Sequence, residues 1–176
     1  MKIIVMALIF TLFTGCNQDR NVRKPDIDKL LKSTDMNNSI IVMDTYLGEL
    51  CSYGDDMEKL NEYQQNFYYI QLLEAEVNNG GFDQYFYNSG GDHALETIRG
   101  LKAIGADKTA KLLQEAMNQF PNGEVPKYRE IRISTLEKIR PESEKVFEKL
   151  DDAFYTYEDD LNTLNMEYIR MYKNHF

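Results

Sequence analysis

Histidine and cysteine, the residues that most often bind metals or attack substrates, are rare in this 176-residue chain. His93 and His175 lie far apart, and neither has a partner at the three- or four-residue spacing that puts two ligands on one helix face. Cys51 has no nearby histidine or cysteine, which favours a buried structural thiol over a nucleophile or redox centre. We therefore expect no metal, no cofactor and no enzymatic activity, with His93 on the surface in the first turn of a helix.

Glycine pairs and carboxylates are the other groups that could form a site. Gly80-Gly81 and Gly90-Gly91 lack the Lys-Ser/Thr ending of a phosphate-binding loop, and the acidic pairs lack the spacing of a calcium loop. The formal net charge is −9, so the chain should repel nucleic acid and attract a basic protein. The candidates for an acidic protein-binding surface are Asp55, Asp56, Glu58, Asp151, Asp152, Glu158, Asp159 and Asp160.

The first residues have the order of a bacterial lipoprotein signal: Lys2, an apolar run over residues 3–13, and then Thr14-Gly15-Cys16. This run is shorter than the about 20 apolar residues of a membrane-spanning helix. We expect residues 1–15 to be cleaved, a lipid such as palmitate to be attached to Cys16, and residues 16–24 to form a tether. The protein would then be anchored to a membrane of the cell envelope. An ordinary signal peptide or a short buried helix is the alternative.

The remaining residues, 25–176, are expected to form one all-α domain, a single compact multi-helix bundle. Apolar residues recur at helical spacing, and no strand-like alternation of useful length appears. Helices are expected from Pro25 onward and over residues 40–50, 55–77, 93–104, 108–120 and 128–140, with a short helical segment at 82–87. Asp92 and Asp107 are expected to cap helices, and Pro141 to stop one. The helix before Pro141 is expected to turn Tyr128, Ile131, Thr135 and Ile139 inward.

The last apolar stripe is the most regular in the sequence. Its members alternate spacings of three and four residues: Phe147, Leu150, Phe154, Tyr157, Leu161, Leu164, Tyr168 and Met171. Such a stripe could form a coiled-coil seam between two chains, and so a homodimer. The favoured interpretation is the core-facing side of one long helix or of two consecutive helices, because half of its members are aromatic and suit a globular core.

A block of polar and aromatic residues resembles a known bacterial family. The block consists of Glu76, Val77, Asn78, Asn79, Gly80, Gly81, Phe82, Gln84, Tyr85, Phe86 and Asn88, and the similarity extends over about residues 40–176. The family comprises domains of unknown function and is typified by a neisserial DNA-mimic protein. The resemblance implies an all-helical, often dimeric fold without a cofactor and, for the characterised member, an acidic surface that imitates DNA. The two glycines and Phe82 are better suited to shaping a turn and filling a core than to binding.

Three functions fit these features. The first is a membrane-anchored, cofactor-free acidic module that binds a protein partner of unknown identity. The second is a DNA mimic that binds a DNA-binding protein, which requires access to the cytoplasm. The third is small-ligand binding or hydrolysis in a pocket lined by residues 78–88. The missing catalytic residues and the lipoprotein signal favour the first.

Overall fold

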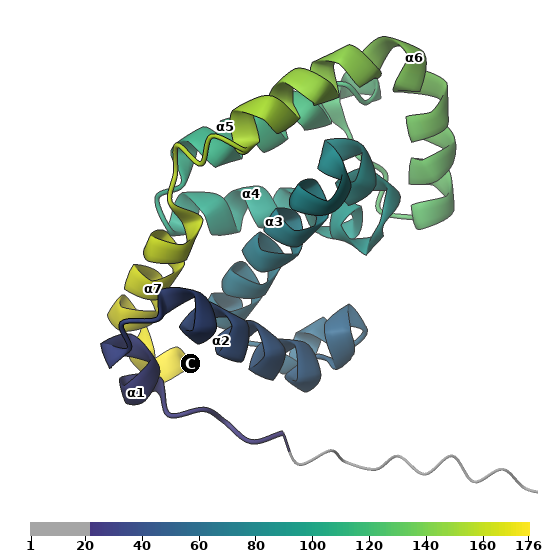
Figure 1. The fold of residues 1–176 in the computed structure, drawn as a ribbon. Helices are drawn as coiled ribbons and strands as arrows, with labels where there is room; N and C mark the ends of the chain where they lie inside the picture. Colours follow the sequence, from purple (N-terminus) through teal and green to yellow (C-terminus); the bar gives the residue numbers. More distant parts are fainter. Residues whose placement is uncertain (1–21) are drawn as a thin grey trace, which may run out of the picture.

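The computed structural model describes residues 22–176, so the expected signal peptide and Cys16 lie outside the described residues. These residues form helices and turns without strands, which confirms the all-α prediction (Figure 1). The α-helices are α1 (Ile27–Lys32), α2 (Met36–Leu50), α3 (Glu62–Tyr87), α4 (Ala94–Ala103), α5 (Asp107–Met117), α6 (Arg129–Phe154) and α7 (Leu161–Met171). The 3-10 turns are η1 (Ser52–Gly54), η2 (Met57–Lys59), η3 (Ser89–His93), η4 (Pro121–Gly123) and η5 (Lys173–His175).

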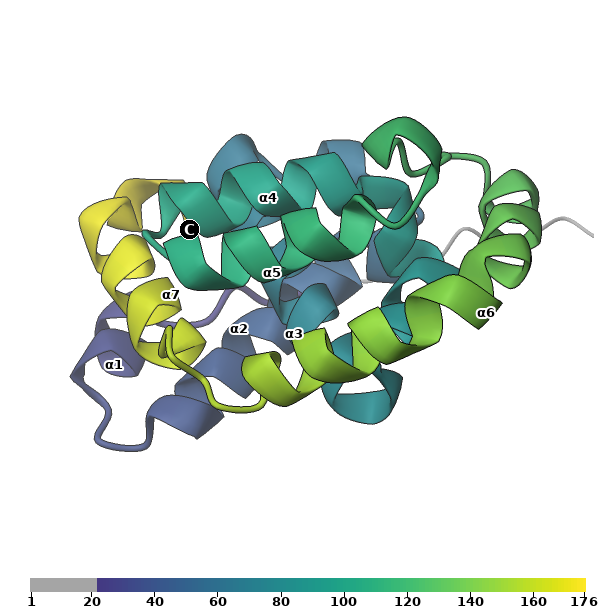
Figure 2. The ribbon, with the colours of Figure 1, turned by 90° about the horizontal axis from the view of Figure 1, so that it is seen from above.

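Helix α3 is the central element of the bundle. It packs against α2, α4 and α6, while α5 contacts α4 and α6, and α7 returns to α2. Figure 2 shows α4 and α5 lying side by side, with α6 running along the flank of the same group. Phe67, Ile70 and Leu73 of α3 are fully buried, so the hydrophobic core follows this helix.

Short polar side chains set several helix starts by accepting backbone N–H groups that have no partner within the helix. Asp26 caps α1, Asp35 caps α2 and Asp160 caps α7. Asn61 forms a capping box with Gln64. Helix α3 therefore begins at Glu62, and the expected start at residue 55 is wrong, because η1 and η2 occupy that stretch.

The two aspartates expected to cap helices have other partners. Asp92 lies in η3 and pairs with Arg132 Nη2 at 2.5 Å, and α4 begins without a side-chain cap. Asp107 is the first residue of α5, where the N–H of Thr109 donates to Asp159 Oδ2 at 2.8 Å. Both predictions failed because of partners far away in the chain, which local sequence patterns do not show: Asp92 is drawn to Arg132, and the start of α5 is bonded by Asp159.

His93 is partly shielded from solvent and Cys51 is fully buried. His93 packs against Tyr69 with ring centroids 4.8 Å apart and is half-buried, so its expected surface position is wrong. Burial lowers the pKa of His93. Cys51 is fully buried, as predicted, and its Sγ donates to the Gly48 carbonyl oxygen at 3.6 Å.

Helix α6 does not stop before Pro141; it continues through the proline to Phe154. Figure 1 shows α6 turning a corner about halfway along its length. Proline removes one backbone N–H and crowds the preceding turn, which accounts for a bend at this place. The inward face of the first half also differs from the prediction, because Tyr128 and Ile131 are exposed while Arg132 and Leu136 are buried.

The regular C-terminal stripe belongs to two consecutive helices, the second half of α6 and α7. Between them the backbone leaves the helical conformation, and Tyr157 has a φ of 49°. Phe147, Phe154 and Leu161 are buried in the core of this chain. Most of the stripe is therefore core-facing, as favoured, although Tyr157 is 40% exposed and Met171 at its end is 73% exposed.

No helix within residues 22–176 combines the length and apolar character needed to cross a bilayer. In the same part of the chain, no three His, Cys, Asp or Glu side chains are grouped so that they could hold a metal ion.

Candidate functional site

The Asn-Gly-Gly-Phe block lies at a sharp break inside α3. Gly80 has φ −168° and ψ 27°, and Gly81 has φ 73° and ψ −174°, so helical geometry ends and restarts here. A Cβ atom on residue 81 would lie 2.2 Å from Asp151 Oδ2, which leaves no room for a side chain. Glycine is required at this position by both its positive φ and this close approach.

Asp151 of α6 caps the helical segment that restarts after the break. Its Oδ1 accepts the N–H of Phe82 at 2.8 Å. Burial raises the pKa of Asp151; the Phe82 N–H opposes this, and the neighbouring carboxylates of Asp152, Asp83 and Glu148 raise the pKa further. Asp151 was predicted to belong to an acidic surface, but its immediate contact is structural.

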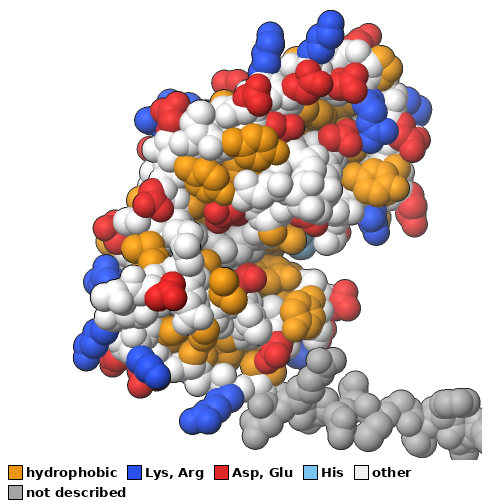
Figure 3. All heavy atoms as spheres, in the orientation of Figure 1, with side chains coloured by type: hydrophobic (Ala, Val, Ile, Leu, Met, Phe, Trp, Pro, Cys, Tyr) orange, Lys and Arg blue, Asp and Glu red, His pale blue; other side chains and the backbone are white. Residues whose placement is uncertain are grey.

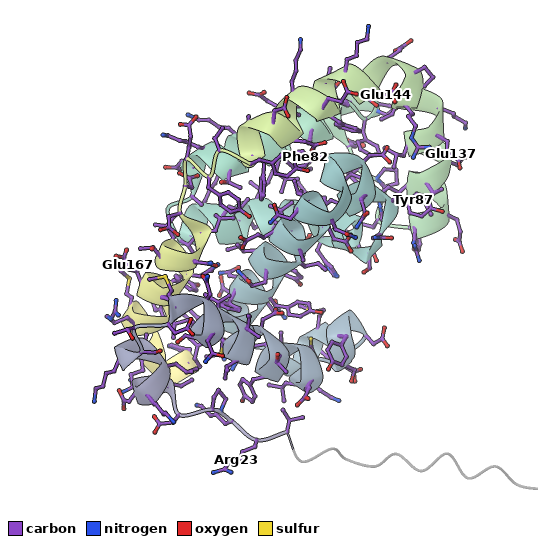
Figure 4. All side chains as sticks on the ribbon, viewed as in Figure 1. Arg23, Phe82, Tyr87, Glu137, Glu144 and Glu167 are labelled. Atoms are coloured by element: carbon purple, nitrogen blue, oxygen red, sulfur yellow. The ribbon has the colours of Figure 1, made fainter. Side chains whose placement is uncertain are left out.

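Phe82 follows the break and fills the core. It is fully buried and meets Phe154 of α6 edge to face, with ring centroids 6.0 Å apart. Figure 4 shows Phe82 between α3 and α6, in the interior of the bundle. The structural role predicted for Gly80, Gly81 and Phe82 is therefore what the geometry supports.

The polar side chains of the block bond one another across the break. Glu76 Oε2 accepts from Gln84 Nε2 and from Asn88 Nδ2, both at 2.8 Å. Asn78 Nδ2 donates to the hydroxyl of Tyr157 at 2.5 Å, and Asn79 is exposed. Because Glu76, Gln84 and Asn88 satisfy one another, the turn supports a structural interpretation better than the ligand pocket of the third hypothesis.

The end of α3 is held by a buried arginine that the sequence analysis missed. Arg132 has no exposed surface. Four hydrogen bonds join its guanidinium to the carbonyls of Phe86 (2.7 Å), Asn88 (2.9 Å), Pro126 (2.9 Å) and Lys127 (3.1 Å), and Nη2 also forms an ion pair with Asp92 Oδ1 at 2.5 Å. A guanidinium held by four carbonyls and one carboxylate is a form in which a buried charge is tolerated.

The aromatic residues before this junction are also buried. The hydroxyl of Tyr85 lies 2.9 Å from Thr97 Oγ1, and the Phe86 ring packs edge to face against Phe120 at 4.9 Å. Together with Arg132, they fix the direction in which the chain leaves α3. The fold therefore brings the residues of the block together, and their contacts serve to hold the bundle in shape.

Several of the predicted acidic residues have partners within the chain. Asp159 binds the N–H of Thr109, and Asp160 caps α7 by accepting from the N–H of Thr163 at 3.0 Å. Glu158 pairs with Lys108 at 2.6 Å. Near η1 and η2, far along the chain, Asp56 pairs with Lys59 at 2.9 Å, and Asp55 and Glu58 belong to the same turn region.

A different acidic hollow lies where the second half of α6 meets the restarted end of α3. It has a volume of about 230 Å³ and is lined by Asp83, Arg140, Glu144, Phe147, Glu148 and Asp151. Arg140 holds Asp83 with two hydrogen bonds, of 3.1 and 2.9 Å, while Glu144 and Glu148 are exposed. Figure 4 shows Glu144 on the outer part of α6, away from α7.

The surface around this hollow is acidic overall. On the face drawn in Figure 3, acidic side chains gather over α6, and basic side chains project at the edge of the same region. Glu144 and Glu148 are four residues apart and so lie on one side of the helix, about 6 Å along its axis. The four-residue spacing of Glu144 and Glu148 can be read from the sequence, whereas Asp83 comes to the same hollow only through the packing of α3 on α6.

The comparisons with known proteins give one match. A family model described as DMP19-like protein matches residues 58–172. Neither the curated proteins nor the solved structures gave a match. The matched residues include the whole break in α3, Arg132 and the acidic hollow.

Proposed function

Because the chain belongs to the DMP19-like protein family, we propose that its domain binds a protein partner, presenting the acidic hollow on α6 to a basic surface. The hollow carries this proposal. Four carboxylates meet there, those of Asp83, Glu144, Glu148 and Asp151, and one guanidinium, that of Arg140, faces them. The remaining negative charge, added to the net charge of −9, would draw a basic partner toward this end of the molecule.

The finer proposal is that the partner is a DNA-binding protein and that the acidic hollow competes with DNA for it. Carboxylates on a rigid helix can occupy the lysines and arginines that otherwise neutralise phosphates. The family to which the chain belongs supports this class of partner, because the resemblance implies an acidic, DNA-imitating surface for its characterised member.

We further propose that the domain works from a lipid anchor on Cys16, after removal of residues 1–15. The order of Lys2, the apolar run and Cys16 supports the anchor. An exported domain would meet partners in the cell envelope, whereas a domain retained in the cytoplasm would meet chromosomal DNA-binding proteins. The location therefore decides which basic proteins are available.

The test of partner class is a competition experiment with the full chain. Labelled duplex DNA is bound to basic DNA-binding proteins from the same cell, and displacement is measured as the chain is added at several salt concentrations. We expect displacement at low salt, where the attraction between exposed charges is least screened. The double variant Glu144→Gln/Glu148→Gln should displace at least roughly tenfold less well, which corresponds to about 1.4 kcal/mol.

The matched control is Glu49→Gln/Glu167→Gln, which removes the same charge from exposed sites on α2 and α7. Figure 4 shows Glu167 on α7, at a distance from α6. Equal losses in the two double variants would assign the effect to net charge and reject the hollow as the site. No displacement of any basic protein would reject DNA mimicry.

The test of the anchor is incorporation of labelled palmitate into the full chain in bacterial cells. We expect label in the wild type and none in Cys16→Ser. A wild type that never acquires label would refute the anchor and would favour a cytoplasmic partner.

A further inference from the structure

A second hollow lies between α2 and α3, on another side of α3 from the acidic hollow. It has a volume of about 190 Å³, and its lining includes Asp44, Gly48, Tyr53, Tyr68, Gln71 and Leu72. Figure 3 shows the surface hollowed between α2 and the end that carries α6. Sites for drug-sized ligands occupy about 300–1,000 Å³, so this volume suits the end of one side chain.

The ring of Tyr53 is placed at this hollow by an unusual turn. Ser52, Tyr53 and Gly54 all have positive φ, of 52°, 55° and 105°. Residue 48 is a glycine, and a Cβ there would lie 3.2 Å from two ring atoms of Tyr53, so the ring lies against the backbone of α2. Tyr53 is 64% exposed, which leaves its ring accessible to a ligand.

Asp44 supplies a negative charge beside this ring. Within the part of the chain that the structure describes, its carboxylate has no ion-pair or hydrogen-bond partner, although burial raises its pKa. Burial is the main cause that raises the pKa of Tyr68, with smaller contributions from Cys51, Asp44 and Asp55. Burial also raises the pKa of Glu74, with smaller contributions from Asp160 and Asp44. A half-buried carboxylate without a cation is a poor arrangement for stability alone.

We propose that the α2–α3 hollow binds the guanidinium group of an arginine side chain presented by the protein partner, an inference that rests on the proposed function. The planar guanidinium can stack on the exposed Tyr53 ring and bond to the Asp44 carboxylate in the same position. The amide oxygen of Gln71 is available on the third side of the hollow. Arginine suits this geometry better than lysine, whose ammonium is compact and strongly hydrated.

The probe is N-acetyl-arginine methylamide, titrated into the full chain while the ring signals of its tyrosines are recorded by NMR. The uncharged isostere, the corresponding citrulline compound, is the control ligand. We expect saturable shifts of the Tyr53 and Tyr68 signals with arginine and none with citrulline. The signal of Tyr53 is identified by its loss in Tyr53→Phe, which keeps an aromatic ring and should keep binding.

Asp44→Asn should weaken binding of the arginine probe at least roughly tenfold, in line with the loss of a charge-assisted hydrogen bond. Glu49→Gln, an equal change on the exposed side of the same helix, should leave binding unchanged. Tyr53→Ala should also abolish the shifts. If Asp44→Asn fails to fold, Thr45→Lys is the second test, because it places a cation at an exposed position that lines the hollow. Thr45→Lys should weaken binding of the arginine probe.

Equal binding of arginine and citrulline, or equal affinity of Asp44→Asn and Glu49→Gln, would overturn the inference. The arginine titration and the competition experiment can fail independently of each other. If basic proteins are displaced from DNA equally well by the wild type and by Asp44→Asn, the hollow plays no part while the proposed function stands. If the arginine probe binds but no basic protein is displaced from DNA, DNA mimicry fails while the arginine site remains.

Discussion

Gly81 and Asp151 depend on each other at the break in α3. The backbone of Gly81 has a φ of 73° and approaches the Asp151 carboxylate so closely that even a Cβ would collide with it. That approach lets Asp151 accept the N–H of Phe82 at 2.8 Å. One residue without a side chain therefore allows two distant segments to meet, and it explains why a glycine stands before the buried phenylalanine.

Gly81→Ala is expected to lower the free energy of unfolding by about 2–4 kcal/mol, the sum of a steric clash and the penalty for a backbone conformation that is essentially restricted to glycine. Urea denaturation measures it. Gly105→Ala is the control, because Gly105 also has a positive φ, of 82°, but a Cβ there meets nothing within 4 Å. Gly105→Ala should lower the free energy of unfolding by only about 1–2 kcal/mol. Equal losses would show that the Asp151 contact is not the reason for the glycine.

Asp44 should make stability depend on pH in a particular direction. Burial raises its pKa in the folded state above the usual 3.8, so the folded protein binds this proton more tightly than the unfolded chain does. Its contribution to stability is therefore present below 3.8 and is lost as pH rises through the raised pKa. The advantage of Asp44→Asn over the wild type in urea denaturation should thus grow from pH 4 toward neutrality. A constant difference would contradict this account.

At the scale of elements, periodicity located most of the helices but misjudged where one of them faces. The spacing of Tyr128 and Ile131 predicted an apolar inward face for α6, yet both are exposed, and the face is turned so that Arg132 and Leu136 point inward. A buried arginine has no signature in a hydrophobic pattern. Its acceptors come from the end of α3 and the loop before α6, so only the assembled fold reveals its role.

The same limit explains the acidic residues. Asp151 and Asp159 look like surface charges in the sequence because the N–H groups that they accept, those of Phe82 and Thr109, are 69 and 50 residues away. The break at Gly80 and Gly81 was predictable, since it follows from local conformational preference. The acidic hollow was not, because Asp83 and Glu148 meet only when α3 and α6 pack together.

Arg132→Met should destabilise the junction between α3 and α6 by about 3–5 kcal/mol, since it leaves buried acceptors and Asp92 without a partner. Thermal and urea denaturation measure this loss. Arg129→Met, one turn earlier and exposed, should change stability by only about 0.5 kcal/mol. Similar values for the two variants would mean that the buried hydrogen bonds contribute little net stability.

At the scale of the whole molecule, the C-terminus fastens one end of the bundle. Phe176 is buried, with its ring 6.4 Å from Phe67 of α3 and 6.3 Å from Tyr168 of α7. The carbonyl of His175 accepts from Asn61 Nδ2 at 2.7 Å, at the start of α3. The last residues therefore connect α7 to the central helix.

Phe176→Ala is expected to lower the free energy of unfolding by about 3–5 kcal/mol, because it leaves a cavity beside α3. Met171→Ala, at a position 73% exposed, should have an effect within about 0.5 kcal/mol. Urea denaturation of both variants measures the difference. A small effect of Phe176→Ala would show that α7 is held in place without the terminal ring.

The first described residues and the corner of α6 lie at opposite ends of the molecule. Figure 4 shows Arg23 at one end and Glu144 at the other, and Figure 1 places α1 and the C-terminus together at the Arg23 end. The basic residues near that end are Arg23, Lys24, Lys29, Lys32, Arg170 and Lys173. A lipid on Cys16, only seven residues before Arg23, would hold Arg23 within about 25 Å of the headgroups, on the side of the molecule that carries these cations. The corner of α6 would then lie on the side of the domain that faces away from the bilayer.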